Sequence, residues 1–162
     1  MTEVTLEPWE REWAGHVGTQ RHKARLTTPN AEHYDDSRME DDLRADIAGA
    51  VAELAVAKRL NRYWNGSYWT AQQHSKYVKG ADVGANTEVR RIRDRSHKLQ
   101  VRTTDVERNR IMVLAYPVPD DFTVVEVVGY GWASELWEFG EVASFDKTGR
   151  VRLVRQGWLY PL

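Results

Sequence analysis

Apolar positions recur at helical spacing in two segments of the first sixty residues. Between residues 39 and 60 they fall at intervals of three and four, as Leu43, Ile47, Val51 and Leu54. This pattern predicts an amphipathic helix, and the alanines between these positions would let it pack closely on a sheet. The same spacing is weaker in residues 9–25, where it predicts an N-terminal helix. The polar residues 27–41 between them predict a loop that leads into the second helix.

Strand-like patterns dominate after residue 80. Residues 98–102 alternate between polar and apolar, and the β-rich runs 111–116 and 122–130 predict a hairpin. Residues 103–110 have room only for a turn or a short helix. Ser134 is a candidate N-cap for another short helix. Residues 150–160 predict a last strand. The order of elements predicts an α+β fold, a mixed β-sheet with the N-terminal helices packed on it.

Residues 79–90 predict a further β-hairpin that carries two carboxylates. A three-residue loop of Gly84, Ala85 and Asn86 would set Asp82 across from Glu88, and Arg90 would share the face of Glu88 because strand side chains alternate. Two carboxylates about 5 Å apart repel by roughly 3 kcal/mol at an effective dielectric of about 20. A cation must offset this repulsion, and either a divalent metal or the local arginines would do so.

The composition is that of an ordinary globular protein. A length of 162 residues fits one domain over residues 1–162. We expect no membrane association and a cytoplasmic location, because no apolar run is long enough to span a bilayer and the N-terminus does not resemble a secretory signal. The chain has no cysteine, so any metal must be held by oxygen or imidazole ligands.

Charge is strongly segregated along the chain although the formal net charge is only −1. Residues 76–110 carry a net +5 and surround the predicted hairpin, whereas residues 111–146 carry a net −7. A basic block around an acidic pair suits a polyanion such as nucleic acid, although a solvated strand face would give the same pattern. The candidate contacts are Lys79, Arg91, Arg93, Arg95 and Arg102.

Glu53 is the one charged residue between positions 47 and 57 of the alanine-rich helix. A carboxylate in such surroundings is costly to desolvate unless a partner compensates it. Glu53 is therefore a candidate functional acid at the edge of the apolar stripe. The alternative is that it projects into solvent or pairs with Lys58 or Arg59.

Taken together, these residues resemble the PD-(D/E)XK nuclease superfamily, in which a helix with a Glu precedes a hairpin with an Asp and a Glu-x-Lys triplet. Here Glu53, Asp82 and Glu88-Val89-Arg90 would correspond. The resemblance implies a restriction-endonuclease-like core over about residues 40–130, to which helix 8–25 and the C-terminal strand are additions. It also implies a small relative of the kind that bacteriophages encode, acting in the host cytoplasm.

The resemblance to that superfamily implies that the protein is a metal-dependent DNA phosphodiester hydrolase. Asp82, Glu88 and the carbonyl of Val89 would hold Mg²⁺ or Mn²⁺, and Glu53 would complete the shell directly or through water. Arg90 stands where the family most often has Lys; it can stabilise phosphate charge but cannot readily exchange a proton. The alternative is a catalytically inactive, nuclease-like protein that binds nucleic acid or a host protein, and a homodimer is a further candidate assembly.

Overall fold

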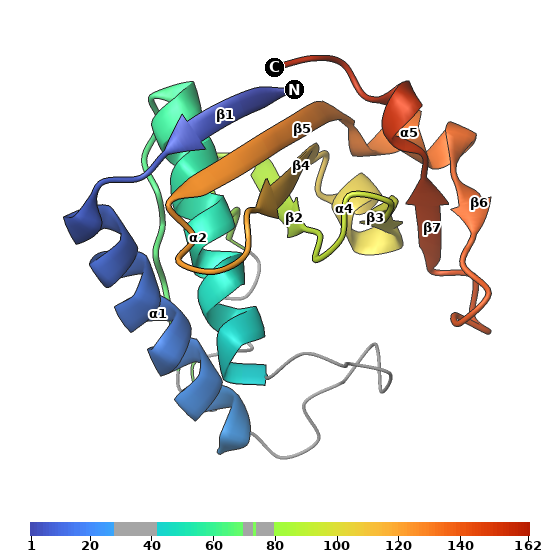
Figure 1. Ribbon diagram of the computed structural model, residues 1–162. Coiled ribbons are helices and arrows are strands. Elements are labelled where there is room, and N and C mark those ends of the chain that lie inside the picture. The colour runs from blue at the N-terminus through green and yellow to red at the C-terminus, as the bar shows by residue number, and fades with distance from the viewer. Residues whose placement is uncertain (28–41, 70–72, 74–79) are drawn as a thin grey trace.

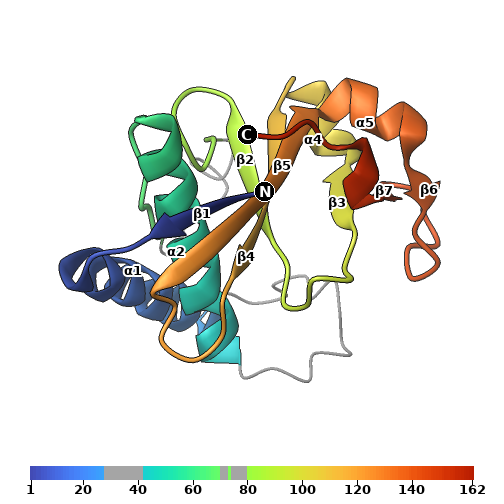
Figure 2. The same ribbon diagram turned by 45° about the horizontal axis from the view of Figure 1, so that its top comes forward.

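The protein is built in three layers, as the computed structural model shows (Figure 1). The structure describes residues 1–27, 42–69, 73 and 80–162. Helices α1 (Pro8–Leu26) and α2 (Asp42–Leu60) cover one face of a four-stranded sheet, here called the main sheet. A three-stranded sheet, the small sheet, lies on the other side with the short helix α5 (Figure 2). The α+β class with a mixed sheet is thus confirmed.

The main sheet contains β1 (Thr2–Thr5), β5 (Val124–Trp132), β4 (Ile111–Pro117) and β2 (Thr87–Arg91), in that order. Strands β1, β5 and β4 pair antiparallel, whereas β2 lies parallel to β4. Residues of β4 alternate between the two hydrophobic cores: Val113 packs with the helices, and Met112 packs with the small sheet. Strand β4 is therefore apolar throughout, because both of its faces are covered.

The small sheet contains β3 (Leu99–Arg102), β7 (Val151–Val154) and β6 (Glu141–Val142). Helix α4 (Thr103–Glu107) follows β3 directly, α5 (Ala133–Phe139) follows β5, and a 3₁₀ turn (Gln156–Trp158) follows β7. Leu99 and Val101 of β3 point into the second core. Their neighbours Gln100 and Arg102 are therefore left on the outer face of the small sheet.

The two long helices form where the apolar spacing predicted them, and they pack against each other. Gly18 of α1 lies so close to α2 that a Cβ atom there would stand 2.4 Å from the Cα of Ile47. A side chain at this position would force the helices apart, so the absence of one is a packing requirement. The predicted loop 27–41 and the predicted helix start at Met39 lie outside the described residues, apart from Thr27.

Several predicted boundaries are wrong in detail. Helix α5 begins at Ala133 with Trp132 as the N-cap, so Ser134 lies in the first turn and does not cap it. The C-terminal strand covers only Val151–Val154 and joins the small sheet, and strand β1 was not predicted. The hairpin of β4 and β5 is confirmed. No helix in the described part of the chain has the length and apolar character needed to cross a membrane.

Candidate functional site

The predicted three-residue loop after Asp82 is present. Val83 and Thr87 exchange both backbone hydrogen bonds, at 3.1 and 3.2 Å, and enclose residues 84–86. Gly84 adopts a φ of +57°, which favours glycine. The first strand of the predicted hairpin is only this isolated bridge, and Val83 forms a second isolated bridge with Trp64 in the preceding segment. Asp82 and Glu88 directly flank this bridge, and the charge of Glu88 acts on the Asp82 carboxyl, but no backbone pairing extends to these two residues.

Asp82 lies in a buried environment that contains two further carboxylates, Glu53 and Glu88. Its Oδ2 atom accepts a hydrogen bond from the backbone N–H of Val89 at 2.9 Å. Burial raises the pKa of the Asp82 carboxyl well above its ordinary value, and the negative charges of Glu53 and Glu88 raise it further; the Val89 bond and Arg90 oppose this shift only in part. The surroundings of Asp82 therefore favour a bound proton or another cation.

Glu88 is neutralised by an arginine on its own strand. Arg90 donates to Glu88 at 2.8 Å through Nη1 and to both oxygens of Asp105 at 2.9 and 3.0 Å through Nη2. Asp105, at the start of α4, also accepts the backbone N–H of Arg102 at 2.8 Å. The shared face of Glu88 and Arg90 is as predicted. Asp105 was not predicted, because an acid in a short polar segment carries no pattern of its own.

Glu53 is buried and held by three hydrogen bonds. Arg21 of α1 donates to its two oxygens at 2.6 and 2.8 Å, and Trp64 Nε1 donates at 3.0 Å. Lys58, one of the predicted alternative partners, instead pairs with Glu10 at 2.7 Å. The expectation that Glu53 needs a compensating partner is confirmed, but solvent and Lys58 do not supply it. Arg21 and Glu53 are 32 positions apart, so local sequence patterns cannot predict that they pair.

The oxygen atoms around Asp82 meet some of the requirements of a site for a small cation that binds oxygen ligands. An extended residue points its N–H and C=O to the same side, so the Val89 carbonyl faces the same edge as the N–H that Asp82 accepts. Asp82, Glu88 and this carbonyl would be the ligands, and Mg²⁺ commonly uses only one or two carboxylates with several waters. Glu53 already accepts three hydrogen bonds, two from Arg21 and one from Trp64. Over residues 1–27, 42–69, 73 and 80–162, no three acids or histidines are grouped for metal binding.

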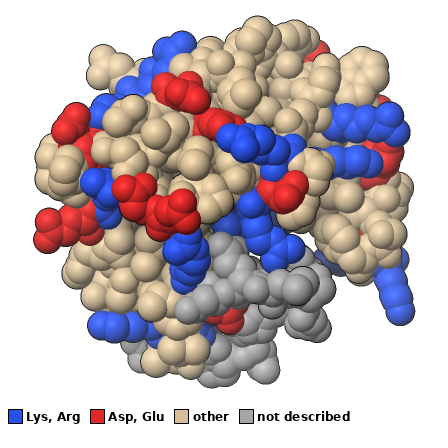
Figure 3. Space-filling model, viewed as in Figure 1, with Lys and Arg blue, Asp and Glu red and all other residues tan. Residues whose placement is uncertain are grey.

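The predicted nucleic-acid contacts separate into different environments. Arg91 and Arg102 line a pocket beside the end of β2. Arg95 instead pairs with Glu126 of β5 and lies 4.8 Å from the ring of Tyr116. Arg93 is exposed, and Lys79 lies outside the described residues. In Figure 3, several Lys and Arg side chains lie near the middle of the view, above the grey residues, with Asp and Glu side chains among them.

The raised pKa of Asp82 predicts a pH-dependent stability difference between the wild type and Asp82→Asn in EDTA. Asparagine still accepts the Val89 N–H but cannot ionise. An acid with a raised folded-state pKa stabilises the fold while protonated, and this contribution is lost as the pH rises from the ordinary value through the folded one. We therefore expect the variant to melt at a higher temperature at neutral pH, with the difference shrinking towards pH 4. Thermal unfolding followed by circular dichroism between pH 4 and 9 measures it; a pH-independent difference would contradict it.

No protein-family model, curated protein or solved structure matches this chain.

Proposed function

We propose that the protein is a metal-dependent phosphodiesterase that acts on DNA, with Asp82 and Glu88 as its metal-binding carboxylates. One observation carries this proposal. The acidic pair on the hairpin adjoins, through Arg90, a pocket lined by cationic side chains. Carboxylates that bind a divalent cation, next to cations that bind phosphate, are the two components that phosphodiester hydrolysis needs.

Different residues would bind the metal and the phosphate. A Mg²⁺ ion, when bound, would supply an activated water and neutralise charge on the phosphate. Asp82, Glu88 and the Val89 carbonyl would hold that ion, and Glu53, whose position Arg21 and Trp64 fix, would add negative charge to the site. Arg90 stabilises negative charge on the phosphate as a hydrogen-bond donor, and its guanidinium stays protonated throughout.

A second candidate function is nucleic-acid binding without catalysis. The observation that favours it is the position of Arg90, which already neutralises Glu88 and is itself held by Asp105. An arginine that satisfies the acids removes the need for a metal, and the pocket would then bind phosphate alone. A host protein or a second copy of the chain would be the partner of such a module.

Metal-dependent cleavage tests the first function directly. We expect the purified protein to degrade plasmid or single-stranded DNA with Mg²⁺ or Mn²⁺ and to leave both intact in EDTA, because the ion supplies the activated water. Gel electrophoresis of the products measures this. If both substrates remain intact with either ion over a long incubation, the phosphodiesterase function is wrong.

Calorimetric titration with Mn²⁺ separates the two functions without relying on turnover. A heat of binding that disappears in Asp82→Asn supports a metal site at the acidic pair. Absence of any heat, together with retained DNA binding in a mobility-shift assay, supports the non-catalytic module.

A further inference from the structure

Arg90 is held between two carboxylates in an arrangement that leaves one of its donors unused. Its Nη1 donates to Glu88 at 2.8 Å, and Nη2 alone serves both oxygens of Asp105, at 2.9 and 3.0 Å. Its Nε is buried and, within the part of the chain that the structure describes, has no hydrogen-bond partner. A buried N–H without an acceptor is costly, so this arrangement does not satisfy the guanidinium fully.

A second arrangement of Arg90 would use the unpaired Nε. Arginine pairs most favourably with a carboxylate through two parallel N–H bonds, one to each oxygen. Arg95 pairs in this way elsewhere in the protein, because its Nε and Nη2 donate to different oxygens of Glu126. The Nη2 of Arg90 already lies on Asp105, so a rotation that brings Nε onto the second Asp105 oxygen would complete the same pair. That rotation would withdraw Nη1 from Glu88.

We propose that Arg90 exchanges partners, moving from Glu88 to a two-bond pair with Asp105 when a divalent cation occupies the acidic pair. Asp105 is then a positioning residue, because it acts on the site through Arg90. The inference rests on the proposed function for the metal and deepens it, since it names the group that must leave Glu88 before Glu88 can serve as a ligand. The Nη1 group that leaves Glu88 becomes the donor that Arg90 offers to phosphate.

Electrostatic attraction favours Asp105 as the partner of Arg90 once a metal is present. Burial lowers the pKa of Arg90, but the negative charges of Asp105 and then of Glu88 outweigh it, so the pKa lies above its ordinary value. Asp105 exerts the stronger electrostatic attraction of the two acids. A divalent ion on Glu88 would repel the guanidinium and leave the attraction of Asp105 unopposed.

Both acids are prepared for the exchange. Asp105 is only 6% exposed, and its Oδ2 accepts the backbone N–H of Arg102 at 2.8 Å, which fixes the carboxylate independently of Arg90. Glu88 lies near a second arginine, because Nε of Arg110 stands 3.9 Å from its Oε2. Glu88 therefore keeps a neighbouring cation while Arg90 moves, which lowers the cost of breaking its hydrogen bond to Arg90.

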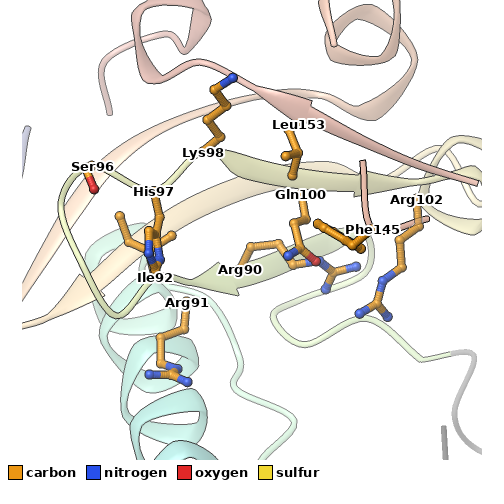
Figure 4. A pocket seen from close by; sticks show the side chains of 10 residues that line it. All are labelled: Arg90, Arg91, Ile92, Ser96, His97, Lys98, Gln100, Arg102, Phe145 and Leu153. Carbon is orange, nitrogen blue, oxygen red and sulfur yellow. The ribbon is translucent and has the colours of Figure 1, made fainter. Parts of the chain in front are cut away.

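The surroundings of Arg90 give its side chain room to move. Arg90 lines a pocket of about 480 Å³ beside the end of β2, and Figure 4 shows its side chain among the other residues of that lining. The exchange needs only a change of side-chain rotamer, because both partners already contact the same guanidinium. The backbone of β2 can stay where it is.

Mn²⁺ affinity measured by calorimetry tests the exchange. We expect Arg90→Gln to bind Mn²⁺ about tenfold or more tightly than the wild type, because Glu88 then has no arginine to release. Asp105→Asn should bind it about fivefold or more weakly, because Arg90 loses its alternative partner and stays on Glu88. The two variants break the same ion pair, so a purely structural role would change both affinities in the same direction.

A double variant shows whether Asp105 acts through Arg90. In the Arg90→Gln background, Asp105→Asn should change the affinity by less than about twofold. The double variant also leaves no Asp105 charge buried without a partner, so it replaces Arg90→Gln in the comparison if circular dichroism shows that the single variant is unfolded. Arg25→Gln is the matched control, since Arg25 has a similar exposure of 21% but pairs with Asp46 of α2. Its affinity should stay within about twofold of the wild type.

The outcomes separate this inference from the proposed function. The exchange is wrong if removing Arg90 does not tighten Mn²⁺ binding, if Asp105→Asn does not weaken it, or if Asp105→Asn weakens it equally with and without Arg90. None of these results affects a wild type that cleaves DNA with Mn²⁺. Conversely, opposite shifts in a protein that cleaves nothing support the exchange and refute only the phosphodiesterase function. Absence of Mn²⁺ binding in every form overturns both.

Discussion

Replacing Arg21 with methionine is expected to lower the free energy of unfolding by about 3–5 kcal/mol, the typical cost of leaving a buried charge without its partner. Arg21 donates two short hydrogen bonds to Glu53, whose side chain is only 10% exposed. Methionine retains most of the side-chain volume but no donor, so Glu53 would keep only the Trp64 N–H. Against a total of about 5–15 kcal/mol for a typical domain, this loss is severe. Urea denaturation followed by circular dichroism measures it.

Two controls separate this effect from a general consequence of removing an arginine. In the double variant Arg21→Met with Glu53→Gln, no buried charge remains, and we expect most of the lost stability to return. Arg155→Met removes an arginine that pairs with Glu141 at 2.8 Å but is 69% exposed, so its cost should stay within about 1 kcal/mol. If Arg21→Met costs no more than Arg155→Met, water compensates Glu53 and the pair is not a structural requirement.

The parts of the fold that could be predicted from the sequence are those that local patterns determine. Helix α2 could be predicted because its apolar spacing repeats over several turns, and the loop after Asp82 because Gly84 permits the required φ. Strand β4 was recognisable as a strand from its composition. Its parallel pairing with β2 was not, because a continuous apolar run shows burial of both faces but does not name the neighbouring strand.

The candidate site likewise combines residues that are close in the sequence with partners that are distant in it. Asp82, Glu88 and Arg90 lie within nine residues, so turn geometry and strand alternation were enough to bring them together. Two of the partners come from elsewhere in the chain: Asp105 of α4 pairs with Arg90, and Arg21 of α1 pairs with Glu53. Such contacts depend on how the helices and strands pack. Local periodicity therefore predicted Asp82, Glu88 and Arg90, and the structure was needed to find Asp105 and Arg21.

The Asp82→Asn variant is expected to reduce metal-dependent DNA cleavage by about 10²–10³-fold, because the metal contributes several kcal/mol to stabilising the transition state. Asparagine is nearly isosteric and still accepts the Val89 N–H, so the loop should keep its shape. It removes one of the two carboxylates that carry the negative charge at the hairpin edge. Initial rates of plasmid cleavage at saturating Mg²⁺ or Mn²⁺ measure the loss, and a partial recovery at higher Mn²⁺ would show that metal affinity is the cause.

A matched control comes from the same basic block. Asp94 is an exposed acid in the turn before Ser96, away from the acidic pair, and Asp94→Asn should leave the rate within about twofold, as expected of a surface substitution. Equal losses in the two variants would show that overall charge, rather than a metal site, sets the rate. Such a result would favour the second candidate function, nucleic-acid binding without catalysis.

The decisive feature of Asp82→Asn is that stability and activity should change in opposite directions. Without metal, burial and the negative charges of Glu53 and Glu88 make an ionised Asp82 unfavourable, so neutralising it should stabilise the fold at neutral pH. With metal, the same charge is what the ion requires. A residue that served only structure would lose stability and activity together. If both changes are observed, they support a cation-binding role for Asp82, because functional sites commonly retain charges that are unfavourable for stability.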